Sequence, residues 1–365
     1  MDRDEAAAWV RLLETPGLGR GSARKLLAAF GSPQAVFSSS PSARREVVGA
    51  ELASALAASS EDIERQIATT LAWLDTSAPE ARTVITLGDP GYPAPLLQTA
   101  DPPLLLYAQG HAELLQVESL AVVGSRNPTP QGAENARAFS THLSSAGLVI
   151  VSGLALGIDA AAHEGGLDGG AGTIAVVGTG LDRVYPRRNR ELAHRIATDG
   201  LIVSEFPLGT SPRSENFPIR NRIIAGLTRG TLVVEAALQS GSLITARLAL
   251  EAGREVFAIP GSIHAPQARG CHALIKQGAK LVDRAEDVLE ELRMPAPGSG
   301  GAGASAPTRD DPLLEALGYD PVTLDALIAR TGRSAADLNI RLLELELEGR
   351  ISRLPGQLFQ RVARG

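Results

Sequence analysis

Seven short runs rich in valine and isoleucine constrain the fold of this chain more than any other feature. Within each run the apolar residues are continuous rather than alternating with polar ones, a pattern typical of strands buried on both faces. Segments of helical character, such as QGAENARAFSTHLSSAG, separate the runs. This alternation predicts an α/β fold with an extended, Rossmann-like, doubly wound, mostly parallel sheet. The predicted strands are SLAVVG (119–124), LVIVSG (148–153), TIAVVG (173–178), LIVSEF (201–206), TLVVEA (231–236), EVFAIPG (255–261) and KLVD (280–283).

Composition divides the 365 residues into four parts. Residues 1–80 are rich in alanine and predict a small all-α domain, and residues 82–294 contain the predicted Rossmann-like core. Residues 295–308 consist of small residues and proline and predict a flexible linker. Residues 309–365 then predict a small C-terminal domain.

The chain has the character of a cytoplasmic protein. Its start, MDRDEAAAWVRLLE, is charged and unlike a signal peptide, and no apolar run reaches the roughly 18 residues of a membrane span. The single cysteine, Cys271, fits a reducing compartment. The net charge of −6 argues weakly against coating of nucleic acid through bulk positive charge, although charge distribution matters more than the sum. We therefore expect a cytoplasmic location and no membrane contact.

Small residues follow several predicted strands where an open α/β sheet binds its ligands, at the carboxyl ends. Glycine and serine leave backbone N–H groups open there, and electropositive helix N-termini lie next to them. Four such loops predict an anion cradle for phosphate, whereas a single loop could be only a tight turn. The loops are 124–127, 152–159, 178–180 and 239–242.

The familiar catalytic and cofactor motifs are absent from the sequence. The nearest match to a dinucleotide fingerprint, GTGLDR at 178–183, lacks the third glycine, and no phosphate-binding P-loop motif occurs. The six histidines form no metal-ligand spacing, and no G-x-S-x-G nucleophile elbow occurs. Asp159, His163 and Glu164 could form a proton-transfer pair, but an ordinary buried helix explains them better. We therefore predict a binding protein and not an enzyme, with no catalytic residue, no metal and no cofactor.

The segment ENFPIRNRIIAGL at 215–227 is the most informative single stretch. Pro218 predicts an extended approach, with a helix beginning at Arg220. Arg220 and Arg222 cannot face the same way on a regular helix, so one could reach a phosphate while the other forms a structural ion pair. Phe217 is a candidate platform for stacking a base, although core packing is the simpler role for a lone phenylalanine. Between Asp182 and Gly230, nine arginines stand against five acidic residues, which locates positive charge near this segment.

At these motifs the chain resembles the DprA/Smf family of DNA-processing proteins. The resemblance implies a protein that binds single-stranded DNA without sequence preference and forms a homodimer through its Rossmann core. It also implies interaction with the RecA recombinase, which such a protein loads onto DNA during natural transformation; a role in repair stays open. The matching stretches are AVVGSRNPTPQG, IVSGLALGIDAAAHEGGL, TIAVVGTGLDRVYPRRNREL, SEFPLGTSPRSENFPIRNRIIAGLT and VVEAALQSGSLITARLALEAGREVFAIPGS.

The resemblance also implies a DNA-binding site, residue by residue. The arginines are expected to pair with phosphates, the Gly/Ser turns to donate backbone N–H groups, and Phe217 to stack on a base. The expected site residues are Gly124, Ser125, Arg126, Ser152, Gly153, Phe217, Arg220, Asn221 and Arg222, together with Ser240, Gly241 and Ser242.

The N-terminal segment TPGLGRGSARKLL at 15–27 is similar to a helix-hairpin-helix, whose glycines could offer N–H groups to a DNA backbone. Family resemblance suggests instead a domain like the sterile alpha motif (SAM). The two interpretations stay open.

The C-terminal part predicts a winged helix. A first helix ends at Gly332, a second begins after Ser334, and a two-strand wing turns at Pro355 and Gly356. The later half of the second helix carries three glutamates that would repel phosphate, which favours a protein contact or a structural role over DNA recognition. We therefore expect a chain ending at Met294 to keep its basal DNA binding.

The sequence leaves two other classes of function open. The first is a nucleotide-processing enzyme on a Rossmann-like sheet, such as a phosphoribohydrolase. The second is a dinucleotide-sensing regulator, which the broken glycine fingerprint disfavours.

Overall fold

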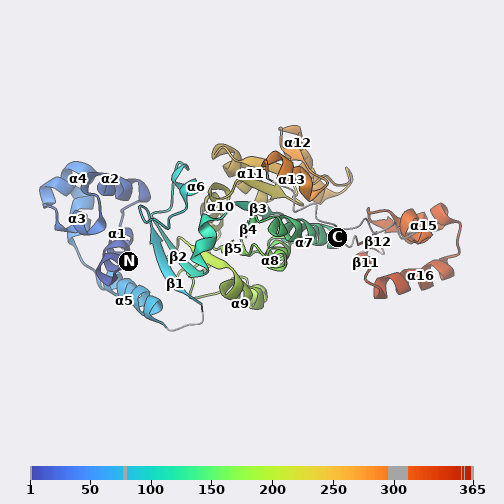
Figure 1. The fold of residues 1–365 in the computed structure, drawn as a ribbon, viewed down its shortest axis with the longest axis horizontal. Coiled ribbons are helices and arrows are strands. Elements are labelled where there is room, and N and C mark those ends of the chain that lie inside the picture. Colours follow the sequence, from blue (N-terminus) through green and yellow to red (C-terminus); the bar gives the residue numbers. More distant parts are fainter. Residues whose placement is uncertain (1, 77–79, 295–310, 355, 357, 363–365) are drawn as a thin grey trace.

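A nine-stranded sheet forms the centre of the protein in the computed structural model, which describes residues 2–76, 80–294, 311–354, 356 and 358–362 (Figure 1). The strand order is β1-β2-β6-β5-β4-β3-β7-β8-β9, and all pairs from β6 to β9 are parallel. The predicted parallel strands are all present, at β3 (Ser119–Val123), β4 (Val149–Ser152), β5 (Thr173–Val176), β6 (Leu201–Ser204), β7 (Gly230–Val233), β8 (Glu255–Ala258) and β9 (Lys280–Leu281).

Two antiparallel strands that the sequence pattern did not single out extend the sheet beyond β6. They are β1 (Arg82–Thr86) and β2 (Leu105–Gly110), and β2 pairs with β6. The segment between them contains the short helix α6 (Ala94–Leu97), and η1 (Ala112–Gln116) follows β2.

Helices cover both faces of the sheet, as the doubly wound prediction requires. On one face lie α7 (Pro130–Ser145), α8 (Ile158–Gly169) and α9 (Arg190–Asp199), with α13 (Ala285–Glu291) packed against α7. On the other lie α10 (Asn216–Leu227), α11 (Ser242–Glu251) and α12 (Arg269–Lys276). The chain runs from β3 toward β4 but from β7 toward β8, in opposite directions across the sheet. A topological switch point therefore lies between the adjacent strands β3 and β7.

The N-terminal helices share a hydrophobic core with the antiparallel edge of the sheet. They are α1 (Arg3–Glu14), α2 (Arg20–Phe30), α3 (Pro33–Ser38), α4 (Pro41–Ala57) and α5 (Glu61–Asp75). Trp73 of α5 packs edge-to-face on Tyr107 of β2, with ring centres 5.9 Å apart. One cluster of buried side chains includes both these residues and Leu12, so a common core crosses the predicted boundary near residue 80.

The C-terminal part contains the predicted winged helix. It consists of α14 (Pro312–Leu317), β10 (Val322–Thr323), α15 (Leu324–Thr331), α16 (Ala335–Leu347), β11 (Ile351–Leu354) and β12 (Leu358–Arg361). Gly332 adopts a left-handed conformation directly after α15, and the Ser334 hydroxyl accepts a hydrogen bond from the Asp337 N–H at the start of α16. Both helix ends therefore follow from local capping chemistry. The predicted linker, 295–308, and Pro355 of the wing turn lie outside the described residues.

Within the described ranges, no helix has both the length and the apolar character needed to cross a membrane.

Candidate functional site

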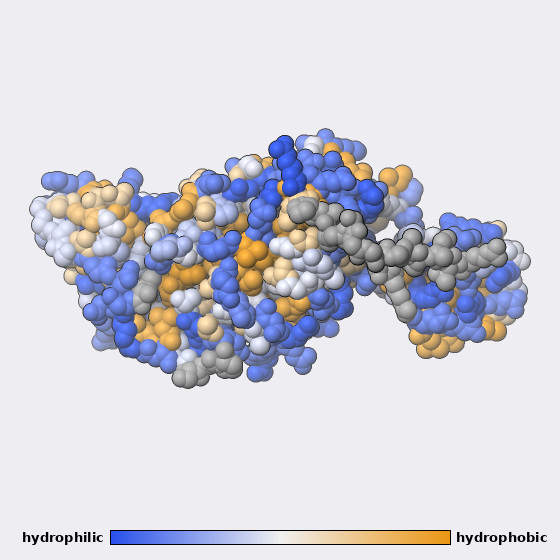
Figure 2. All heavy atoms as spheres, viewed as in Figure 1, coloured by the Kyte–Doolittle hydropathy of each residue, from blue (hydrophilic) through white to orange (hydrophobic). Residues whose placement is uncertain are grey.

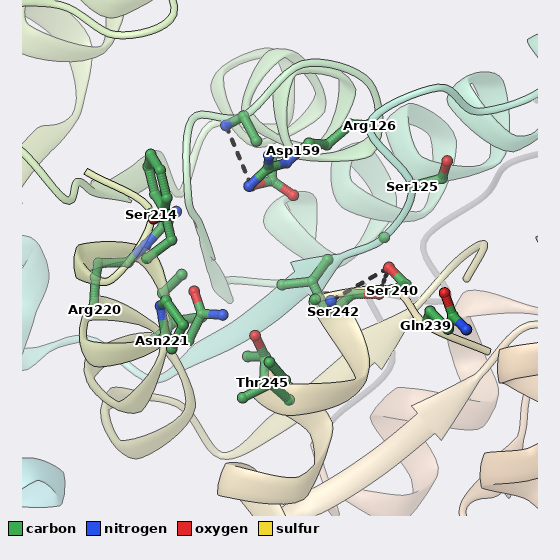
Figure 3. Close-up of a pocket in the computed structure, with 18 of the residues that line it drawn as sticks. Ser125, Arg126, Asp159, Ser214, Arg220, Asn221, Gln239, Ser240, Ser242 and Thr245 are labelled. Carbon is green, nitrogen blue, oxygen red and sulfur yellow. Dashed lines mark hydrogen bonds between the residues drawn. The ribbon is translucent and has the colours of Figure 1, made fainter. Parts of the chain in front are cut away.

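An open cleft of about 780 Å³ lies at the carboxyl ends of β3 and β7, where the topology switches direction. Its lining comes from the turn after β3, the turn leading into α11, the loop before α10 with the first turns of that helix, the loop around Tyr185, and Ala155 and Asp159 near the start of α8. Figure 3 shows Ser240 and Ser242 on one side of this space and Arg220 and Asn221 on the other. Nine of the twelve predicted site residues line the cleft: Gly124, Ser125, Arg126, Phe217, Arg220, Asn221, Ser240, Gly241 and Ser242.

The two turns at the switch point differ in how closely they are packed: only at Gly124 is there no room for a side chain. A Cβ on Gly124 would lie 2.7 Å from the side chain of Ile158 and 2.8 Å from the carbonyl oxygen of Glu235. Across the cleft, the Ser240 and Ser242 hydroxyls hydrogen-bond each other at 2.7 Å. Gly241 precedes the first residue of α11, whose N-terminus has no side-chain cap. The turn and the helix dipole together favour an anion at this wall of the cleft.

An aromatic and cationic cluster lies at the mouth of the cleft. The guanidinium carbon of Arg126 lies 5.5 Å from the centre of the Phe217 ring. The ring of Tyr185 lies 5.9 Å from that of Phe217, with planes 31° apart, and Tyr185 is 46% exposed. Both rings and the exposed Arg126 border the same space, so they form a surface on which a flat group could stack.

Sequence reasoning did not select Tyr185, although it lies inside one of the motifs quoted above. Its only local signal is an aromatic residue before Pro186 in a loop rich in arginine. Arg187, Arg188 and Arg190 follow it, all exposed, and none takes part in an ion pair found among the described residues. Three of the nine arginines counted between Asp182 and Gly230 therefore follow the aromatic residue Tyr185 closely in the sequence.

Arg220 lies at the floor of the cleft and is 4% exposed. Its Nη1 donates a 2.7 Å hydrogen bond to the carbonyl oxygen of Val176. Burial lowers the pKa of its guanidinium to about 10, while the negative charge of Asp159 acts in the opposite direction. Gly153 must lack a side chain, because a Cβ there would overlap the Arg220 guanidinium.

Asp159 is the buried acidic residue whose negative charge acts on Arg220. Its Oδ2 accepts hydrogen bonds from the N–H groups of Gly153 and Ala155, at 3.2 and 3.3 Å. Burial raises the pKa of the Asp159 carboxyl, and the Arg220 charge and these N–H groups oppose that rise. The N–H of Gly153, predicted to face a ligand, therefore serves the fold.

Three predicted site residues do not line the cleft. Ser152 is fully buried and donates to the Val122 carbonyl at 2.6 Å, and Gly153 lies behind Arg220. Arg222 points to another side of α10, where its guanidinium contacts Glu205 at 2.5 Å and Asp101 at 3.3 Å. The expectation that these three lie with the others is wrong, because Ser152 and Gly153 belong to the sheet's interior and Arg222 forms the structural ion pair.

The predicted start of α10 is also wrong. The helix begins at Asn216 and not at Arg220, with Pro218 inside its first turn. Proline is tolerated there because the first turn needs no N–H donor. Asn216 Nδ2 donates to the Gly178 carbonyl at 2.9 Å, which fixes the helix start and with it the position of Phe217.

His163, one of the three residues considered for proton transfer, is fully buried and held by hydrogen bonds inside the fold. Its Nε2 accepts from the Leu154 N–H at 3.3 Å, and its Nδ1 lies 2.7 Å from the Thr173 hydroxyl. Complete burial lowers the pKa of His163 to about 3, so the ring is neutral at ordinary pH. Glu164 instead lies 3.5 Å from Arg137 at the surface. Among the described residues no group of His, Cys, Asp and Glu is placed to hold a metal ion.

Comparison with known proteins agrees with this fold and with the motifs. Residues 83–293 match the family model described as DNA recombination-mediator protein A, and residues 297–357 match that of the DprA winged helix domain. The chain belongs to the DprA/Smf family of DNA recombination mediators. The family's winged helix accounts for the C-terminal fold described above.

Individual members of the DprA/Smf family are similar over much of the chain. Protein Smf of Escherichia coli K12 is 42% identical over 302 residues, 80% of each chain. The DNA processing protein DprA of Streptococcus pneumoniae R6 is 51% identical over 204 residues, 56% of this chain and 72% of that protein.

Two solved structures of the family share the fold. The X-ray structure of DprA from Streptococcus pneumoniae has a TM-score of 0.68 at 40% identity, covering 78% of this chain and 97% of that one. DNA processing protein A from Helicobacter pylori, whose structure concerns its single-stranded DNA binding mode, has a TM-score of 0.53 at 31% identity. That comparison covers 58% of this chain and 96% of the Helicobacter chain.

Proposed function

We propose that this protein binds single-stranded DNA in the cleft between β3 and β7. The observation that carries the proposal is the cluster of Arg126, Phe217 and Tyr185 beside the open turns of the switch point. Single strands are bound by aromatic faces that stack bases and by cationic or N–H groups that contact the backbone. The cleft offers both kinds of group, and the Helicobacter relative is described as binding single-stranded DNA.

The same cleft supports binding without sequence preference. Every base has a π-face, so stacking on Phe217 and Tyr185 would accept any of them. The exposed residues Arg187, Arg188 and Arg190 extend positive charge beyond the cleft and would follow the phosphate backbone.

The proposed DNA binding would serve the protein's role in recombination. The family description, DNA recombination-mediator protein A, supports a role in recombination. We propose that the protein delivers single-stranded DNA to RecA during natural transformation or repair. We also propose that the protein acts in the cytoplasm as a homodimer joined through its Rossmann core.

The test is fluorescence anisotropy of labelled oligo-dT with the wild type, Phe217→Ala and Arg126→Ala across a salt series. Loss of stacking by Phe217 is worth about 1–3 kcal/mol, so this variant should bind roughly 5–150-fold more weakly. Loss of one phosphate contact at Arg126 should make the slope of log affinity against log salt shallower by about 0.7.

Arg247→Ala is the matched control, since Arg247 is an exposed arginine on α11 that does not line the cleft. Its affinity and salt slope should equal those of the wild type. If all three variants bind oligo-dT with wild-type affinity, the DNA site does not lie in the cleft.

One observation favours the alternative of a nucleotide-processing enzyme: a buried carboxyl, Asp159, borders a cleft suited to phosphate. Incubation with nucleoside monophosphates tests it. Saturable release of free base that Asp159→Asn abolishes would establish the enzyme, whereas oligo-dT binding without base release supports the DNA mediator.

A further inference from the structure

The second helix of the winged-helix unit, α16, has apolar side chains on two opposite faces. Leu338, Leu342 and Leu345 are buried in the core of the unit. On the opposite face, Ile340, Leu343 and Leu347 are 63%, 53% and 81% exposed. Figure 2 shows hydrophobic side chains gathered at the lower edge of the right-hand lobe, where Figure 1 labels α16.

The exposed apolar residues follow the spacing of a coiled-coil seam. Ala336, Ile340, Leu343 and Leu347 are separated by four, three and four residues, the d-a-d-a pattern of a heptad. Ala336 is exposed as well. The stripe extends over 11 residue steps of helix, or about 16 Å, which is long enough to pack along a partner helix.

Charge makes DNA a poor occupant of this face. In DNA-binding winged helices the exposed face of the corresponding helix enters the groove. Here α16 and its C-cap carry four acids, at 337, 344, 346 and 348, against one base, Arg341. Arg341 is held by Asp311 and Glu344, each at 2.6 Å, so it is not available to a phosphate.

Neither a second copy of α16 nor the segment before the winged-helix unit suits this face. A second copy of α16 would bring four more acidic side chains to one narrow seam, where like charges repel. Residues 295–310 of the chain contain only proline, alanine, glycine, serine, threonine, one arginine and one aspartate. They therefore offer no large apolar side chain to fill the stripe.

We propose that the exposed face of α16 docks a basic amphipathic helix of another protein. Leucine or isoleucine at the a and d positions of that helix would pack on Ile340, Leu343 and Leu347. Its lysines or arginines would pair with the acids beside the stripe, among which Glu346 has no ion pair within the described residues. The cleft in the Rossmann core plays no part in this contact, so the proposal does not depend on the DNA-binding proposal.

The probe is a fluorescent synthetic peptide with leucine at a and d and lysine at e and g, titrated with the full chain. Saturable binding that weakens with salt is expected, and a scrambled peptide of the same composition should not bind. Leu343→Ser/Leu347→Ser should bind at least about tenfold more weakly. Leu97→Ser, at a leucine on α6 that is also 53% exposed, should bind like the wild type.

A charge-reversed variant distinguishes a specific loss of binding from local unfolding of α16. Glu344→Lys/Glu346→Lys should lose the lysine peptide and gain a matching peptide with glutamate at e and g, a gain that an unfolded helix cannot give.

Three results would overturn the proposal. The first is no saturable binding of the lysine peptide up to about 100 micromolar. The second is self-association of the wild type that Leu343→Ser/Leu347→Ser abolishes, which would assign the face to a second copy. The third is duplex DNA binding lost in the same variant.

Discussion

Removal of Arg220 tests whether the floor of the cleft is held by a buried charge pair. Arg220→Gln would leave Asp159 buried without its opposing charge, while the N–H bonds from Gly153 and Ala155 remain. Arg220 and Asp159 act on each other through their charges and form no direct ion pair among the described contacts. The cost therefore lies at the lower end of the range for breaking a buried ion pair, about 3 kcal/mol. For a core of this size that loss lowers Tm by roughly 6–12 °C.

The assay is thermal unfolding of four proteins: the wild type, Arg220→Gln, Asp159→Asn and the double variant. The double variant should be more stable than the sum of the single losses predicts, by at least about 1 kcal/mol, because it buries no unpaired charge. Arg247→Gln, which alters an exposed arginine on α11, is the control and should unfold like the wild type.

The pH dependence gives a second, independent readout. Burial already raises the pKa of Asp159 in the folded protein, and loss of Arg220 should raise it further above the unfolded value of about 3.9. Between these two pKa values the folded state binds more protons than the unfolded state, so stability falls as pH rises. The loss in Arg220→Gln should therefore be larger at pH 8 than at pH 5. Additive losses with no such pH dependence would refute the charge pair.

Two further predictions concern other buried or paired groups. The pKa of His163 is depressed to about 3, below its unfolded value of about 6.5, so stability should fall by up to ~1.4 kcal/mol per unit as pH drops below 6.5. Urea unfolding at several pH values should show this slope in the wild type and a shallower one in His163→Gln; equal slopes would contradict a neutral buried ring. Asp101 lies 2.9, 2.7 and 3.3 Å from Arg20, Arg24 and Arg222, so it ties α2 to the core. Asp101→Ala should lower the free energy of unfolding by about 1–2 kcal/mol and speed trypsin cleavage in α2, and unchanged proteolysis would show that the shared core alone holds these helices.

Ion pairs with acidic residues from distant segments occupy several arginines that the sequence alone would leave available to DNA. Arg20 and Arg24 lie in the predicted helix-hairpin-helix, but their guanidinium groups contact Asp101, which reduces the charge that this hairpin offers to DNA. Arg222 joins the same network of ion pairs. The sequence showed an excess of arginine but not which guanidinium groups would remain exposed, because each acidic partner comes from a distant segment.

The sequence by itself determined the features that depend on short-range patterns. Continuous apolar runs specified the parallel strands, because a strand buried on both faces must be apolar at every position. Ser334 and Gly332 marked helix ends because capping is satisfied within a few residues. The antiparallel strands β1 and β2 were not predicted from these patterns.

Only the tertiary structure decided which motif residues meet. Strand order brings the turns after β3 and β7 together, although more than 100 residues separate Arg126 from Ser240. It also places Tyr185 against Phe217 and turns Arg222 away from the cleft. Such contacts depend on the order and direction of strands across the whole sheet, and no local pattern of residue types carries that information.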